Sequence, residues 1–164
     1  MTTATPPRPA SYDALVAWGR SARVQSKLVA WGRSARAESL LESARAHDRA
    51  GRVAEAMRDY RAAIAAAEAG GEGAVLADAL RHLSFVHHRR REGAEARSLC
   101  QRSHAVAVAS GDAALASQAL NSLGVYDLDA GDLTLARETF HSALRSATPA
   151  RVRGSIEQNL GILA

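Results

Sequence analysis

The stretch SQALNSLGVYDLDAGDLTLARETFHSA, residues 117–143, decides the fold, because two earlier stretches of the chain can be laid over it at one fixed offset. The offset is 40 residues in both cases. A fixed period in this range is typical of repeat arrays, in which each unit stacks on its neighbours to bury a shared core. The positions that coincide include Ala136, Ala96 and Ala56, and also Leu120, Leu80 and Leu40.

Each copy of the repeat carries two helical patterns separated by a turn. In the last copy Leu120 and Leu123 lie on one helical stripe that ends before Gly131, and Asp132 is placed to cap a second helix. Small residues recur where the two helices would touch, so the backbones are expected to approach closely while leucine and phenylalanine fill the remaining space. These small residues are Gly124, Ala136 and Ala143.

The repeat resembles the tetratricopeptide repeat (TPR) family of helix-turn-helix units. The third copy matches the family pattern through Leu120, Leu123, Gly124, Gly131, Asp132, Ala136, Phe140 and Ala143, and the first through Leu40, Ala44, Gly51, Arg52, Ala56, Tyr60 and Ala63. The second copy is degenerate, with Arg91-Glu92 at the turn and Cys100 at the aromatic position. The resemblance implies an all-α fold, a right-handed superhelical array of antiparallel helix pairs. The family period is about 34 residues, so a period of 40 implies extended hairpins of a long-period bacterial type.

The sequence predicts three segments. Residues 1–11, which hold three prolines and no periodic pattern, are expected to form a disordered tail. Residues 12–36 form a helical leader in which LVAWGRSAR occurs at 15–23 and again, 13 residues later, at 28–36. The second copy is expected to pack Leu28 and Trp31 on the first hairpin as a cap, with bends at Gly19 and Gly32. The array follows, with units at about 37–76, 77–116 and 117–153 and a half unit at 154–164.

Composition and charge agree with a single helical domain of 164 residues. The net charge is +4, of which residues 1–36 contribute +5 through six basic residues and one acidic residue, whereas the repeats contribute −1. Cys100 is alone and sits at a core position, so we interpret it as a small buried hydrophobe. No apolar run is long enough to cross a membrane and Met1–Ala10 has no apolar core, so we expect a cytoplasmic protein without membrane contact.

The search for catalytic or metal chemistry finds no motif with the required context. The histidines His82, His87 and His88 form no i,i+4 pair with one another, and we see no carboxylate or cysteine at ligand spacing. The charge run from His88 to Arg91 fits a helix C-terminus, where basic side chains interact favourably with the helix dipole. We therefore predict no enzyme activity, no cofactor and no metal.

The TPR resemblance implies that the first helix of each unit lines a concave face. Its partner-contacting positions map to Leu41, Arg45, Arg49, Arg81, Phe85, His88, Arg89, Asn121, Val125 and Leu128, with Asp48 and Asp129 beside them. The family's clamp for a C-terminal carboxylate is absent in its usual form. The positions that form this clamp in the family are occupied here by Leu41, Arg45, His82, Gln118 and Ser122. The mixture of arginine and apolar side chains would suit an acidic segment with apolar anchors.

Three functional hypotheses remain open at this point. The leading one is a protein-protein interaction scaffold that binds a protein or peptide in the concave groove. The second is a sensory or regulatory domain of a bacterial signalling or transcription regulator. The third is nucleic-acid binding through the arginine-rich leader; the repeats themselves carry no excess of basic residues that would favour it. Leu160, Gly161 and Ala164 are also expected to face a missing final helix, which would allow a homodimer through the open C-terminal end.

Overall fold

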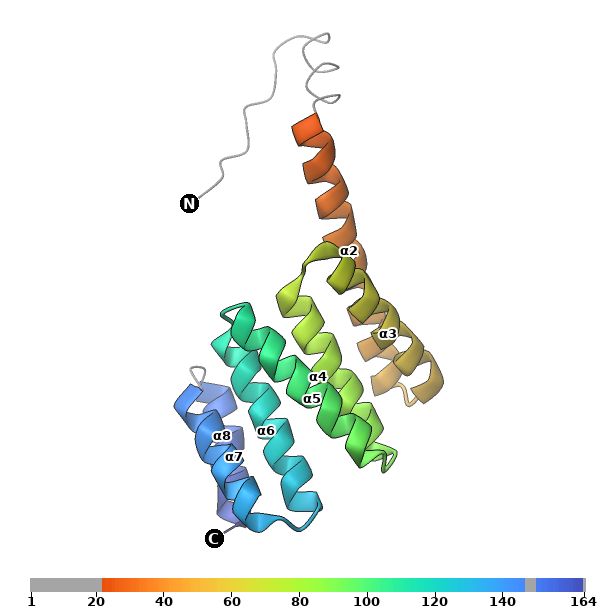
Figure 1. Ribbon diagram of the computed structural model, residues 1–164. Helices are drawn as coiled ribbons and strands as arrows, with labels where there is room; N and C mark the ends of the chain where they lie inside the picture. Colours follow the sequence, from red (N-terminus) through yellow and green to blue (C-terminus); the bar gives the residue numbers. More distant parts are fainter. Residues whose placement is uncertain (1–21, 147–149, 164) are drawn as a thin grey trace.

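The computed structural model describes residues 22–146 and 150–163, and within residues 22–33 it describes the side chains of Gln25, Ser26 and Val29 alone. The described residues are all-α and contain no strand (Figure 1). None of their helices combines the length and the low polarity that crossing a membrane requires. The helices are α2 (Ala22–Arg49), α3 (Val53–Gly70), α4 (Gly73–Arg89), α5 (Gly93–Ala109), α6 (Ala113–Asp129), α7 (Leu133–Ser146) and α8 (Ala150–Ile162).

The helices form an array of antiparallel pairs, as the repeat predicts (Figure 1). The pairs are α2 with α3, α4 with α5, and α6 with α7, and α8 follows as a single helix. The first helices of successive units also touch one another directly, whereas α3, α5 and α7 make no such contacts among themselves. A stack whose first helices meet and whose second helices stay apart must curve, so α2, α4, α6 and α8 line its concave side.

Left-handed residues end five helices at regular spacing. These residues are Gly51, Gly71, Arg91, Gly111 and Gly131, one every 20 residues. In each case two backbone hydrogen bonds close the helix, as in Gly111 N–H to the Val108 carbonyl (3.1 Å) and Asp112 N–H to the Ala107 carbonyl (2.9 Å). This is the Schellman arrangement that favours glycine. The 40-residue period is therefore two nearly equal helices joined by two copies of the same tight turn.

Aspartates cap the helices that follow two of these turns. The Asp112 carboxylate accepts a hydrogen bond from the Leu115 backbone N–H at 2.9 Å, and the Asp132 carboxylate accepts one from the Leu135 backbone N–H at 3.0 Å. Both caps satisfy a backbone donor that would otherwise lack a partner at the start of a helix. The cap predicted at Asp132 is confirmed.

Arg91 occupies a left-handed position, with a φ of 65°, where the other four turns carry glycine. A side chain with a Cβ is strained in this region, so we expect Arg91→Gly to raise the free energy of unfolding by about 1 kcal/mol. The matched control is Gly111→Ala, which introduces the same strain at a turn where an added Cβ meets nothing within 4 Å. This substitution should lower the free energy of unfolding by about 1 kcal/mol. Urea denaturation followed by circular dichroism would measure both changes, and a destabilising Arg91→Gly would contradict the prediction.

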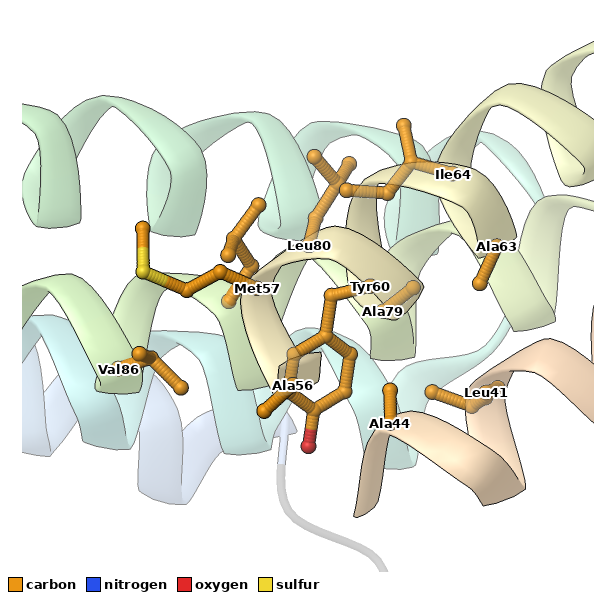
Figure 2. Close-up of a cluster of buried hydrophobic side chains, with 11 residues drawn as sticks. Leu41, Ala44, Ala56, Met57, Tyr60, Ala63, Ile64, Ala79, Leu80 and Val86 are labelled. Carbon is orange, nitrogen blue, oxygen red and sulfur yellow. The ribbon is translucent and has the colours of Figure 1, made fainter. Parts of the chain in front are cut away.

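The core is built from small residues on one helix that face large residues on the other. Tyr60 of α3 is fully buried in a cluster with Ala44 of α2 (Figure 2). Phe140 of α7 is equally buried, and a Cβ added to Gly124 of α6 would lie 2.5 Å from its ring. The close approach predicted from Gly124, Ala136 and Ala143 is therefore confirmed.

In the degenerate second unit, an aromatic side chain of the third unit packs beside the position where the other units have their own. Cys100 stands where the other units have Tyr60 and Phe140, and it lies in one buried cluster with Tyr126 of α6. The Tyr126 hydroxyl is 2.9 Å from the hydroxyl of Ser84, which occupies the small-residue position of the second unit. A ring from the next helix thus occupies the space beside Cys100, so the second and third units share a core.

The N-terminal part of α2 differs from the prediction at one point. α2 runs unbroken from Ala22 to Arg49, so Gly32 does not interrupt the helix, and one continuous helix joins the leader to the first unit. Its first half extends beyond the hairpins, and Val29 is exposed (Figure 1). The predicted tail, the bend at Gly19 and the side chains of Leu28 and Trp31 lie outside the described residues.

The C-terminal helix α8 covers the third unit. Ile156 is fully buried with Phe140, and Leu160 and Leu163 pack against the same cluster. Leu160 is therefore half-buried against this cluster, which corrects in part the expectation that it is displayed at an open end. Gly161 is exposed, and Ile162 is 66% exposed, while Ala164 lies outside the described residues. The predicted starts of the second and third units, at 77 and 117, fall just inside α4 and α6.

Candidate binding groove

One groove of about 490 Å³ on the concave side is lined by all four first helices. α2 contributes one lining residue, α4 and α6 contribute most of the others, and α8 closes the far side. The lining residues are Asp48, Arg81, His82, Phe85, Asn121, Ser122, Val125, Tyr126, Ser155 and Asn159. The array therefore builds a single surface from segments that are more than one hundred residues apart in the chain.

The groove brings together four of the predicted contact residues, which are Arg81, Phe85, Asn121 and Val125. Phe85 is 46% exposed, which is unusual for a phenylalanine in a folded protein.

The other predicted contact residues lie elsewhere. Leu41 is buried in the first core cluster, because its stripe faces α3 and α4, so its side chain is not available as a surface contact. Leu128 packs against the third cluster. Arg49 is exposed at the end of α2, and His88 lines a neighbouring cleft with Asp129.

The sequence mapping missed Ser155, Asn159 and Tyr126. α8 begins 37 residues after α6, and the Asn159-Leu160-Gly161 triplet follows Ser122-Leu123-Gly124 at the same offset. A register of 37 residues in the half unit would have placed Asn159 beside the groove. Tyr126 carries no such signal, because the equivalent position in the second unit is Val86.

The arginines near the groove are held by carboxylates of neighbouring helices. Arg45 of α2 forms ion pairs with Glu42 and with Asp78 of α4. The Arg81 guanidinium also donates to Asp78, at 2.7 Å. Asp78 therefore bridges two arginines and links the first unit to the second.

A second bridge crosses the same two helices. Arg89 of α4 forms an ion pair with Asp48 of α2, and its guanidinium lies 5.0 Å from the centre of the Phe85 ring. Within the charge run, Arg90 pairs with Glu92 at 2.8 Å. These pairs show that much of the run serves contacts within the chain.

His88 makes the corresponding contact between the second and third units. Its Nε2 lies 2.8 Å from the Asp129 carboxylate, and its ring stacks on Tyr126 with 4.3 Å between the ring centres. Tyr126 in turn reaches Ser84 in the core. The wall of the groove is thus connected directly to the packing beneath it.

His82 lies at the base of the groove and is kept neutral by its surroundings. Burial, with the nearby Arg81 guanidinium, lowers the pKa of His82 to about 4. Its ring stacks on the buried ring of Tyr60, and its Nε2 lies 3.0 Å from an Arg81 nitrogen. The Asp78 carboxylate lies 3.4 Å away and favours the protonated ring, but it is shared with Arg45 and Arg81 and does not outweigh burial. At neutral pH the groove therefore presents an uncharged imidazole.

We expect the free energy of unfolding to decrease as the pH falls from about 6.5 towards 4, because the unfolded chain binds a proton at His82 in this window while the folded chain does not. The expected loss is on the order of 2 kcal/mol. His82→Gln should remove most of this pH dependence. The matched control is His104→Gln, at a site where burial also lowers the pKa but no charged neighbour adds to the effect. Equal pH dependence in the wild type and His82→Gln would refute the assignment.

The described residues contain no group of three or more histidine, cysteine or carboxylate side chains that could hold a metal ion. One statement from the sequence needs correction, because Asp78 does precede His82 at i,i+4 spacing and the two side chains do meet. Asp78 is already engaged by two arginines, and no third ligand joins the pair. Burial raises the pKa of the Cys100 thiol to about 11, which leaves it protonated at neutral pH.

Comparison with known proteins supports the fold. No protein family and no curated protein matches the sequence. Among solved structures, the chain is similar to the N-terminal domain of stress-induced protein-1 (STI-1) from C. elegans, with a TM-score of 0.62 and 17% sequence identity. The match covers 78% of this chain and 97% of that domain. The protein therefore has an all-α, TPR-like helical-repeat fold.

Proposed function

We propose that this protein is a non-enzymatic interaction module that holds a segment of a partner protein in the concave groove. The observation that carries the proposal is that all four first helices converge on one groove with an exposed Phe85 on its wall. An aromatic side chain exposed in a concave site is a common anchor for a partner.

The four first helices together are wide enough for an extended segment of chain to cross them. Neighbouring packed helices lie about 10 Å apart, so four of them extend over roughly 30 Å. An extended peptide advances by about 3.3 Å per residue, so roughly nine residues would cross the groove. A partner bound in this way would touch every unit of the array.

The polar groups of the groove are engaged in structural contacts. The Ser122 hydroxyl donates to the Gln118 carbonyl at 3.1 Å, and Asp48 and Arg81 are both in ion pairs. His82 faces Arg81 and Asp78, and no hydroxyl or thiol in the described part of the chain forms a hydrogen bond with its ring that would make it the base for a nucleophile. This arrangement favours binding over catalysis.

The experiment that tests the proposal is affinity purification with mass spectrometry, comparing Phe85→Glu with the wild type. Val108→Glu is the matched control, because Val108 is also an exposed apolar residue of the second unit but lies on α5, outside the groove. We expect Phe85→Glu to lose a partner that the wild type and Val108→Glu both retain, with unchanged circular dichroism in all three. Retention of every partner by Phe85→Glu would contradict binding in this groove.

A further inference from the structure

We infer that the groove selects an uncharged partner segment, whose backbone is held by side-chain amides and whose apolar side chain lies against Phe85 and Val125. This inference rests on the proposed function and names the chemistry of the partner. It replaces the acidic segment expected from the sequence, because the structure pairs the arginines on which that expectation depended.

The first step is the charge of the groove. Of its lining residues only Asp48, Arg81 and His82 can carry charge near neutral pH, and burial together with the adjacent Arg81 guanidinium disfavours the protonated form of His82. Asp48 and Arg81 are of opposite sign, so the lining as a whole is neutral.

The second step is that the nearby arginines are already paired. Arg45 and Arg81 share Asp78, and Arg89 is held by Asp48. A guanidinium keeps N–H donors beyond those in its ion pair, but the charge of each of these arginines is already compensated by a carboxylate of the protein. A partner carboxylate therefore gains less from them than it would from unpaired arginines.

The third step is the hydrogen-bonding character of the opposite wall. The Asn159 side-chain amide donates to the Asn121 side-chain oxygen at 2.9 Å, and the Asn121 amide lies 3.5 Å from the Ser155 hydroxyl. An asparagine side chain has two N–H donors and an oxygen with two lone pairs, so each of these residues keeps capacity for a further bond. A peptide group has the same donor and acceptor chemistry, whereas a carboxylate offers acceptors only.

The fourth step is the apolar contact. Phe85 on α4 and Val125 on α6 belong to the same groove as the asparagines. Burial of an aliphatic or aromatic side chain against them would add about 25 cal/mol for each Å² of apolar surface removed from water. The groove thus combines a hydrophobic contact with backbone hydrogen bonds and supplies no free charge for an acidic ligand.

Selection from a random 12-residue peptide display library would test this inference. Binders are selected on the wild-type protein, and those that also bind Phe85→Glu are removed, so that only groove-dependent peptides remain. We expect these peptides to be enriched in apolar residues, with aspartate and glutamate at or below their frequency in the library. Enrichment of aspartate and glutamate would overturn the inference and leave the proposed function intact. A selection that yields no groove-dependent peptide would count against both.

Calorimetric titration of a selected peptide gives the second readout. The Asn121→Ala, Asn159→Ala double variant should weaken binding about tenfold, the size expected when one or two hydrogen bonds are lost. Gln101→Ala, an amide removed from the exposed surface of α5 outside the groove, should leave the affinity unchanged. Raising the salt from 50 to 500 mM should change the affinity less than about twofold. Salt weakens contacts between charges, and the proposed contacts of an uncharged segment contain none. A tenfold loss in salt with an unaffected asparagine variant would show that charge, and not the amides, recognises the segment.

Discussion

Replacing Gly124 with alanine is expected to lower the free energy of unfolding by about 2 kcal/mol, although alanine is the better helix former. The added Cβ would lie 2.5 Å from the ring of Phe140, which is fully buried, so the ring or the two helices must shift. Reducing the ring should relieve the clash, so Phe140→Leu should be less harmful in the Gly124→Ala background than in the wild type. Urea denaturation of the two single variants and the double variant measures this coupling.

The control for Gly124→Ala is Gly154→Ala. Gly154 lies in the interior of α8, and a Cβ added there would meet nothing within 4 Å. Alanine should therefore stabilise the protein at this position by roughly 0.5–1 kcal/mol. Opposite signs at the two glycines are the expected result. A stabilising Gly124→Ala, or additive effects in the double variant, would show that α6 and α7 do not pack as closely as the structure indicates.

Replacing Tyr126 with alanine is expected to cost about 3–5 kcal/mol, the range for removing a buried aromatic side chain. Tyr126 is 5% exposed and fills the space beside Cys100, where the second unit lacks an aromatic residue of its own. Its loss should destabilise the second and third units together, since the ring belongs to α6 and packs on the second hairpin. Hydrogen exchange of the amides in α5 and α6 would show whether both helices lose protection.

Two further variants separate the ring from the hydroxyl at this site. Tyr126→Phe should cost about 1 kcal/mol or less, because the Ser84 hydroxyl still donates to the Arg81 carbonyl at 2.7 Å. Cys100→Phe should overpack the wild-type core but recover part of the stability when Tyr126 is alanine, since the new ring occupies the vacated space. If Cys100→Phe is equally harmful in both backgrounds, the two side chains do not compete for one space.

The sequence alone determined the fold and most of the local structure. The 40-residue register located the hairpins, because tight packing of two helices requires small residues such as Gly124 opposite large ones such as Phe140. Gly51 and Gly131 marked two of the five left-handed turns, and Asp132 marked a cap. These features depend on neighbours in the chain or on one partner helix at a fixed offset, so a pattern of residue types is enough to reveal them.

The sequence predicted part of the groove for the same reason. Arg81, Phe85, Asn121 and Val125 repeat at positions that the first helices present to the concave side, and the structure brings them into one groove. Whether they bind a partner there remains a prediction.

The tertiary structure decided the charge of the groove and its far wall. From the sequence, Arg45 and Arg89 were expected to contact a partner. In the structure each forms an ion pair with a carboxylate of another helix, more than thirty residues away along the chain. Asn159 lines the groove because α8 follows α6 at an offset of 37 residues. Tyr126 of the third unit packs in the core of the second unit. A repeat pattern describes one unit at a time, whereas ion pairs and shared cores depend on the distance between units. That distance is set only when the whole array packs together.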